Sequence, residues 1–128
     1  MKIFIATKNA KKLKELNRIL VPMGFEVLCE KDLDKPFADA IEDGTTFEEN
    51  AIIKAKSGLA QTGYISVADD SGICVDALNG KPGIYSARFS KGTIYEEDNV
   101  NRSNNKMLLD LMKEKTNRKA HYTCEMVF

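Results

Sequence analysis

Two adjacent carboxylates are the side chains of this sequence best suited to chemistry. Asp69 and Asp70 directly follow the apolar segment 64–68 and precede Ser71 and Gly72. Open α/β sheets bind ligands beyond the carboxyl ends of their strands, which is where we expect this pair. Carboxylate oxygens are hard donors that Mg²⁺ accepts beside phosphate oxygens and water. The alternative is a plain turn in which Asp70 and Ser71 bond backbone amides and Gly72 takes a positive φ; the pattern leaves both open.

A second candidate is a lysine-rich junction between a strand and a helix, with the sequence Thr7-Lys8-Asn9-Ala10-Lys11-Lys12. The free N–H groups of a helix start, together with the helix dipole, favour an anion there. Lysine ammonium groups at the same place add point charges that suit phosphate. The spacing is not that of a Walker P-loop. Taken alone, the segment is equally an ordinary capped helix with solvated lysines.

A third candidate is the acidic turn Glu42-Asp43-Gly44-Thr45-Thr46-Phe47, which on its own fits a solvated loop before a helix. Charge is segregated around these candidates. Residues 1–20 hold six basic groups and one acid, whereas residues 26–50 hold nine acids and two lysines. A basic segment beside an acidic one would suit a metal-bound polyphosphate, although such segregation also arises without function.

The elements that must position these residues alternate between strands and helices. We expect strands over 2–7, 25–29 and 64–68, with a short further strand over 73–76. Asn9 should cap a first helix, and the capping box from Thr46 to Glu49 should open a second whose buried face is Ile52, Ala55 and Leu59. Gly63 should end that helix. This order predicts an α/β or α+β layered fold.

The last third of the chain carries two further patterns. Thr93 and Glu96 form a second capping box, predicted to open a helix whose apolar face is Met107, Leu108, Leu111 and Met112. From Tyr122 to Phe128, apolar and polar residues alternate as in a half-buried strand, with Tyr122, Cys124, Met126 and Phe128 on the apolar side. Because the sequence stops inside this strand pattern, we expect the intact protein to extend beyond Phe128.

Composition excludes several classes of protein. The chain has 128 residues, 43% hydrophobic and 30% charged, which is typical of one soluble globular domain. Equal numbers of basic and acidic residues argue against a generic nucleic-acid binder, and no apolar run is long enough for a membrane span. Three cysteines without C-x-x-C spacing favour a reducing cytoplasm. The single histidine, His121, should be exposed, so nothing supports acyl transfer by a Ser-His or Cys-His pair.

Four motifs in order are more specific than any one of them. They are Thr7-x-Asn9-x-x-Lys12, Gly44-x-Thr46-Phe47-x-Glu49-Asn50-Ala51 with Lys54-Ala55, Ala68-Asp69-Asp70-Ser71-Gly72, and Gly80-x-Pro82-Gly83-Ile84-Tyr85-Ser86-Ala87-Arg88. With them the chain resembles the inosine triphosphate pyrophosphatase (HAM1-like) family, hydrolases of non-standard purine nucleotides. The resemblance runs from about Lys2 to Phe128.

The resemblance implies an elongated α/β fold with a mixed sheet, flanking helices and a cleft between two lobes, of which residues 1–128 would be the N-terminal part as a single domain. It implies Mg²⁺-dependent hydrolysis of ITP, dITP or XTP to the monophosphate and pyrophosphate, by a homodimer that binds neither nucleic acid nor membrane. By position, Thr7, Lys8, Asn9, Ala10, Lys11 and Lys12 look like the triphosphate cradle and Ser71 like a substrate contact. Glu42 and Asp70 look like metal ligands, with Asp70 also activating water and Asp69 supporting it.

Two departures from the family pattern limit these expectations. Lys11 stands where the family usually has glycine, and the family's later motifs, Phe-Gly-Tyr-Asp-Pro and Ser-His-Arg, are absent. Those motifs contact the base and the phosphates, so the chain as given could be inactive. The alternatives are a Maf-type nucleotide pyrophosphatase, a nucleotide- or metal-binding module without turnover, and a plain structural domain.

Overall fold

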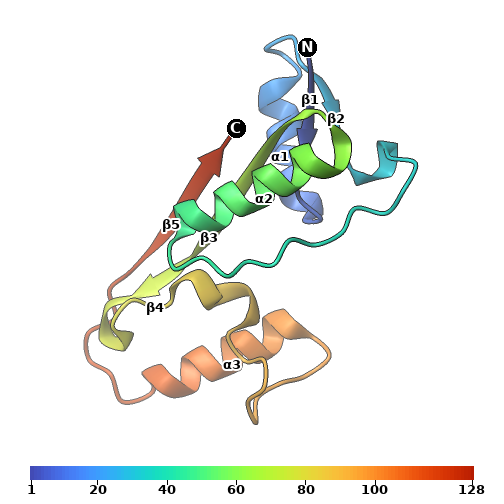
Figure 1. Cartoon of the computed structure of the whole chain (residues 1–128). Coiled ribbons are helices and arrows are strands. Elements are labelled where there is room, and N and C mark those ends of the chain that lie inside the picture. The colour runs from blue at the N-terminus through green and yellow to red at the C-terminus, as the bar shows by residue number, and fades with distance from the viewer. The chain divides into compact units, whose positions relative to one another are not determined.

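The computed structural model describes residues 1–128 (Figure 1), which divide into two compact units. The first unit comprises residues 1–70 and 125–128, and the second comprises residues 71–124. The elements in chain order are β1 (Lys2–Ile5), α1 (Ala10–Leu20), β2 (Glu26–Leu28), η1 (Glu30–Asp32), α2 (Phe47–Thr62), β3 (Ile65–Val75), η2 (Asp76–Leu78), β4 (Lys81–Pro82), η3 (Gly83–Arg88), α3 (Val100–Met112) and β5 (Ala120–Val127), where η marks a 3₁₀ helix.

The strands form one mixed sheet, as expected from the alternating elements. Its order is β2-β1-β3-β4, with β5 also paired to β3. β1 runs parallel to β2 and to β3, whereas β3 and β4 are antiparallel. The predicted α/β class, with a mixed sheet and flanking helices, is therefore confirmed.

Alternate residues of β1 build two separate cores in the first unit. Ile3 and Ile5 pack against Leu16 and Leu20 of α1. Phe4 points to the opposite face, where the core also contains Ala6, Ala55 of α2 and the ring of Phe37. The centroids of the Phe4 and Phe37 rings lie 5.1 Å apart. Because successive strand residues point to opposite faces, a four-residue strand can hold a helix on each side.

β3 is longer than the sequence predicts. In place of the expected strand over 64–68, turn at Asp69–Gly72 and short strand over 73–76, one continuous strand of 11 residues runs from Ile65 to Val75. Gly72 is not among the glycines with positive φ, so the expected alternative of a turn there is wrong. Pairing with β1 reaches Val67 and pairing with β4 begins at Cys74, so the two aspartates lie on the stretch of β3 between these partners.

The buried face of α2 consists of small residues and one amide. Thr46 caps the helix as predicted, and Gly63 ends it with a φ of 74°. The buried residues are Asn50, Ala51, Ala55 and Gly58, whereas Leu59 of the predicted face is 51% exposed. A Cβ on Gly58 would lie 2.6 Å from Ser66 Oγ, so the helix backbone lies directly on β3. This close approach requires glycine and brings the side chains of α2 next to the strand.

Two predictions for the last third of the chain need correction. α3 begins at Val100 because Asn99, and not Thr93, caps it by accepting a hydrogen bond from the Arg102 N–H. Thr93 and Glu96 instead make turn contacts with Ser90 and Gly92. Met112 is buried, but Leu111 is 41% exposed.

The orientation of β5 is the reverse of the predicted one. Tyr122 is 81% exposed and Met126 46%, whereas Val127, on the expected polar side, packs against the core around Phe4. His121 is exposed as expected. The three cysteines are free thiols, and only Cys74 is buried. None of the three α-helices combines the length and the hydropathy needed to span a bilayer.

Candidate active site

The side chain of Lys54 lies at the centre of a group of oxygen atoms in the first unit. Its Nζ is 2.8 Å from Glu42 Oε1 and 3.2 Å from Asp70 Oδ1, and it donates a hydrogen bond of 3.0 Å to the carbonyl oxygen of Asp69. Glu42 comes from the loop before α2, Lys54 from the middle of α2, and the aspartates from β3. The two carboxylates that the family resemblance marks as metal ligands are therefore brought together by one ammonium group.

The protonation of this group follows from its burial and its charges. Burial disfavours the charged ammonium of Lys54, but the hydrogen bond and charge of Glu42, joined by Asp70, outweigh it and raise the pKa of Lys54. Burial raises the pKa of Asp70, while Lys54 opposes that change by charge and hydrogen bonding. Asp70 is thus a carboxylate whose raised pKa makes it a better proton acceptor than an ordinary aspartate, and it lies beside an ammonium group whose charged form is favoured.

Asp69 takes part in a second ion pair. Its Oδ2 lies 2.7 Å from Nζ of Lys12, which belongs to the first turn of α1. The side chain of Asp69 is only 7% exposed and that of Lys12 29%, so the pair is largely shielded from water. The predicted cradle residue Lys12 and the predicted carboxylate pair are therefore adjacent.

The start of α1 differs from the open anion site expected from the sequence. Oδ1 of Asn9 accepts hydrogen bonds from the N–H groups of Lys11 and Lys12, and the N–H of Asn9 itself bonds Thr7 Oγ1. Three of the four backbone donors at this helix start are therefore already hydrogen-bonded to side chains. An anion here would rely on lysine ammonium groups, or would displace the amide of Asn9.

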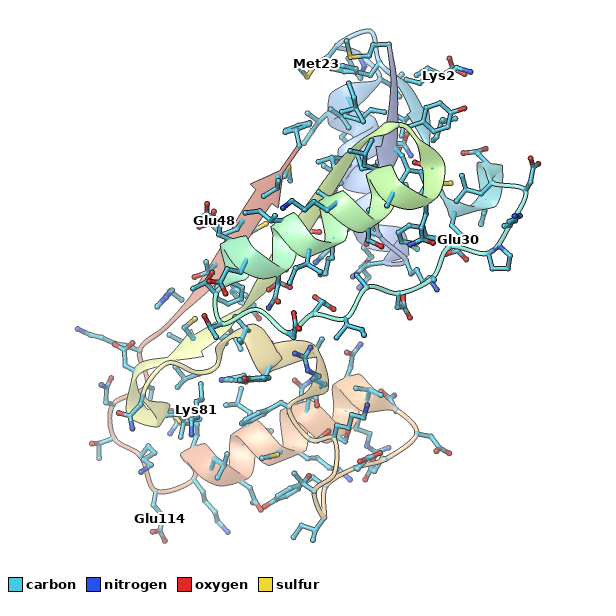
Figure 2. All side chains as sticks on the ribbon, viewed as in Figure 1. Lys2, Met23, Glu30, Glu48, Lys81 and Glu114 are labelled. Carbon is cyan, nitrogen blue, oxygen red and sulfur yellow. The ribbon has the colours of Figure 1, made fainter.

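The other predicted cradle residues lie around the same helix start. Lys8 Nζ is 3.7 Å from Glu30 Oε2 and 3.3 Å from Asp39 Oδ1, and the Glu30 side chain is labelled in Figure 2. Ala10 and Lys11 are exposed in the first turn of α1. Ser71, the predicted substrate contact, is half-buried and belongs to the second unit.

The donor set fits a divalent cation that is shared with phosphate. No group of three or more His, Cys, Asp or Glu side chains forms a complete metal cage. Mg²⁺, however, commonly uses one or two carboxylates and takes its other ligands from phosphates and water. Oδ2 of Asp70 is buried and has no hydrogen-bond partner, and such an atom calls for a ligand. Glu42 and Asp70 therefore suit the predicted metal.

Two residues of this site received no role from the sequence. Lys54 and Asn50 were visible only as members of a family motif. Their spacing of four residues puts them on one helix face, but an isolated lysine on a helix is usually a solvated charge. The informative signal was the run of small residues at 51, 55 and 58, which lets that face approach the sheet.

Comparison with known proteins identifies the family of this chain. The family model described as Ham1 family matches residues 3–128. The chain belongs to the Ham1 family. A dITP/XTP pyrophosphatase from an Exiguobacterium species is 48% identical to this Ham1 chain over 127 residues, which are 98% of this chain and 61% of the relative. The dITP/XTP pyrophosphatase of Thioalkalivibrio sulfidiphilus is 45% identical over 130 residues, covering 100% of this chain and 63% of the relative.

Solved structures of Ham1 proteins share the fold. A HAM1 protein from Coxiella burnetii aligns with a TM-score of 0.81 at 30% identity, covering 98% of this chain and 61% of that one. A structure named nucleoside-triphosphatase / dITP/XTP pyrophosphatase, from Mycobacterium abscessus, aligns with a TM-score of 0.75 at 40% identity, covering 99% of this chain and 65% of that one. This Ham1 chain spans about three-fifths of the length of the curated relatives that it matches.

Proposed function

We propose that this Ham1 chain carries the phosphate- and metal-handling residues of a pyrophosphatase for non-standard purine nucleoside triphosphates such as dITP, ITP and XTP. The observation that carries the proposal is the convergence of Glu42, Asp70 and the Asp69 carbonyl on Lys54, beside the Lys12–Asp69 pair. Three carboxylates and two ammonium groups within one small region suit the binding and cleavage of a metal-bound triphosphate. The names of the relatives supply the nucleotide class.

In the proposed reaction, water attacks the α-phosphorus and the bond from that phosphorus to the bridging oxygen breaks, giving the monophosphate and pyrophosphate. Asp70 accepts the proton of the attacking water, a role favoured by the raised pKa of its carboxyl. Mg²⁺ held by Glu42 and Asp70 would supply positive charge that neutralises phosphate oxygens and makes water more acidic. Lys54 and Lys12 stabilise negative charge that develops on the phosphates.

The remaining assignments belong to the same proposal. Asp69 holds Lys12 for the triphosphate and so supports Asp70, Ser71 contacts the substrate, and the segment 7–12 forms the cradle. We also propose that the protein is a homodimer. We further propose a cytoplasmic location, because three free cysteines suit a reducing compartment.

The direct test is release of pyrophosphate from ITP, dITP, XTP and GTP, with Mg²⁺ and with EDTA. The proposal expects turnover of the non-standard nucleotides with Mg²⁺, little with GTP and none with EDTA. A panel that showed equal turnover of pyrimidine and standard purine nucleotides would favour a Maf-type enzyme instead. Tight binding of a triphosphate with no pyrophosphate released would indicate a binding module without turnover.

Asp70→Asn is the sharpest variant for this reaction. The amide keeps the shape of the side chain but can neither accept the proton nor offer a charged ligand, so kcat should fall by about 100-fold or more. The control is Asp76→Asn, which makes the same change at an exposed carboxylate of η2 and should leave kcat unaltered. An Asp70→Asn variant with kcat within about tenfold of wild type would remove Asp70 from the mechanism, since tenfold is only ~1.4 kcal/mol of barrier.

A further inference from the structure

The side chain of Asn50 is the most deeply buried polar group of the first unit. It is 1% exposed, and its Oδ1 accepts a hydrogen bond of 2.9 Å from the N–H of Gly44. Its Nδ2 is buried without a hydrogen-bond partner. A buried donor left unpaired is costly, and native proteins seldom keep one without a reason.

The carboxylate of Asp70 offers the matching acceptor. Its Oδ1 faces Lys54, whereas its Oδ2 is buried and has no hydrogen-bond partner. The unpaired atom of Asn50 is thus a buried N–H donor and that of Asp70 a buried acceptor, and the side chain of Asn50 acts to lower the pKa of Asp70, as a donor beside a carboxylate does. Since Asn50 precedes Lys54 by four residues, α2 presents two nitrogen donors on the face that meets Asp70.

The other end of the same amide holds the loop that carries Glu42. A Cβ on Gly44 would lie 2.7 Å from Asn50 Oδ1 and 2.8 Å from Glu49 Cβ, so the loop backbone lies directly against Asn50. Glu42 is only two residues before this anchored glycine. The position of its carboxylate therefore depends on the Gly44–Asn50 hydrogen bond.

We propose that Asn50 is a positioning residue that sets both metal-binding carboxylates through one buried amide: Oδ1 fixes the Glu42 loop and Nδ2 orients Asp70. The proposal rests on the proposed function, because it takes Glu42 and Asp70 as the metal ligands. Asn50 itself touches neither metal nor phosphate in this scheme. It acts by fixing the distance and direction between two groups that come from different elements.

The test measures metal binding and not turnover. Mn²⁺ is titrated into the full chain with α,β-methylene inosine triphosphate, and the free ion is followed by electron paramagnetic resonance. Asn50→Leu, a substitution of similar size that removes both hydrogen-bonding ends, should weaken Mn²⁺ affinity by about tenfold or more and alter the line shape of the bound ion. Gly44→Ala adds a Cβ that would lie too close to Asn50 Oδ1, so this variant should also weaken Mn²⁺ affinity.

The matched control is Asn104→Leu in the second unit. The amide of Asn104 bonds the backbone of Ser86, Ala87 and Ser90, so its loss should lower the melting temperature. It should leave Mn²⁺ affinity within about twofold, because it touches no proposed ligand. If Asn50→Leu fails to fold by circular dichroism, Asn50→Ser is measured in its place.

A double-mutant cycle separates positioning from general damage. In a Glu42→Gln background, Asn50→Leu should weaken Mn²⁺ binding much less than it does in wild type. One of the two carboxylates that Asn50 positions is already absent from that background. An undiminished effect there, or wild-type affinity in Asn50→Leu, overturns the inference. A wild-type chain that binds no Mn²⁺ with the analogue would instead overturn the proposed function.

Discussion

The ammonium group of Lys54 lies where the proposed metal ligands converge. This single positive charge lies between Glu42 and Asp70 and offsets part of the repulsion between the two carboxylates. The same ammonium competes with a divalent cation for these oxygens. We therefore expect free Mg²⁺ to bind weakly and the Mg²⁺–triphosphate complex to bind well, because phosphate oxygens offer Lys54 new partners.

Replacing Lys54 by methionine tests this competition. Removing one partner of a shielded ion-pair group leaves charge uncompensated and should cost roughly 3 kcal/mol of unfolding free energy. Added Mg²⁺ should then raise the melting temperature of Lys54→Met more than that of wild type, because it binds the released carboxylates. Lys56→Met, at an exposed position of the same helix, is the control. Equal Mg²⁺ effects on all three proteins would show that Lys54 does not shield a cation site.

At the scale of elements, the start of α1 is stabilised by its own side chains. Oδ1 of Asn9 accepts hydrogen bonds from two backbone N–H groups that would otherwise be free to bind an anion. Asn9→Ala should therefore lower the unfolding free energy by about 1 kcal/mol in urea denaturation, the usual value for a lost helix cap. Lys11→Ala, exposed in the same turn, should change it by less than about 0.5 kcal/mol. Equal effects of the two substitutions would mean that Asn9 does not cap the helix in solution.

The orientation of β5 makes a second prediction at this scale. Val127 packs against the core around Phe4, whereas the larger Met126 is 46% exposed. Val127→Ala should thus cost about 1 kcal/mol of unfolding free energy, and Met126→Ala much less. If Met126→Ala instead lowers the unfolding free energy more than Val127→Ala does, β5 has the orientation that the alternation of the sequence predicts.

At the scale of the whole molecule, both units lose stabilising carboxylates in acid. Hydrogen bonds from Thr45 lower the pKa of Glu49 below its ordinary 4.5, and the hydrogen bond of Lys106 does so for Glu97. A carboxyl whose pKa is lower in the folded than in the unfolded state stabilises the fold above the unfolded value, and that stabilisation is lost as pH falls through the folded value.

The melting temperature should therefore fall as the pH drops below about 4.5, and Glu49→Gln and Glu97→Gln should each make that decline shallower. Differential scanning calorimetry of wild type and both variants, at several pH values from neutral to acidic, measures the melting temperature of each protein. Parallel curves for wild type and both variants would exclude these two groups as sources of the acid sensitivity.

Local features of this protein could be predicted from the sequence because they depend on neighbours along the chain. The Asn9 and Thr46 caps involve donors two or three residues away, and Gly63 ends its helix by its own backbone freedom. The order of four motifs likewise carries the resemblance to the family without any knowledge of the fold. The carboxylates proposed for the site were likewise candidates from the sequence, whereas Lys54 was given no role there.

Only the tertiary structure decided how these parts meet. Lys54 finds Glu42 and Asp70 across 12 and 16 residues of chain, a contact set by how closely the small face of α2 lies on β3. Asp69 and Asp70 remain in a strand because partners on both sides of that stretch extend β3. Alternation in β5 defines two faces, but packing against Phe4 chooses Val127 for the core. Each of these outcomes depends on segments distant in sequence, whose burial and pairing energies exceed the local preferences.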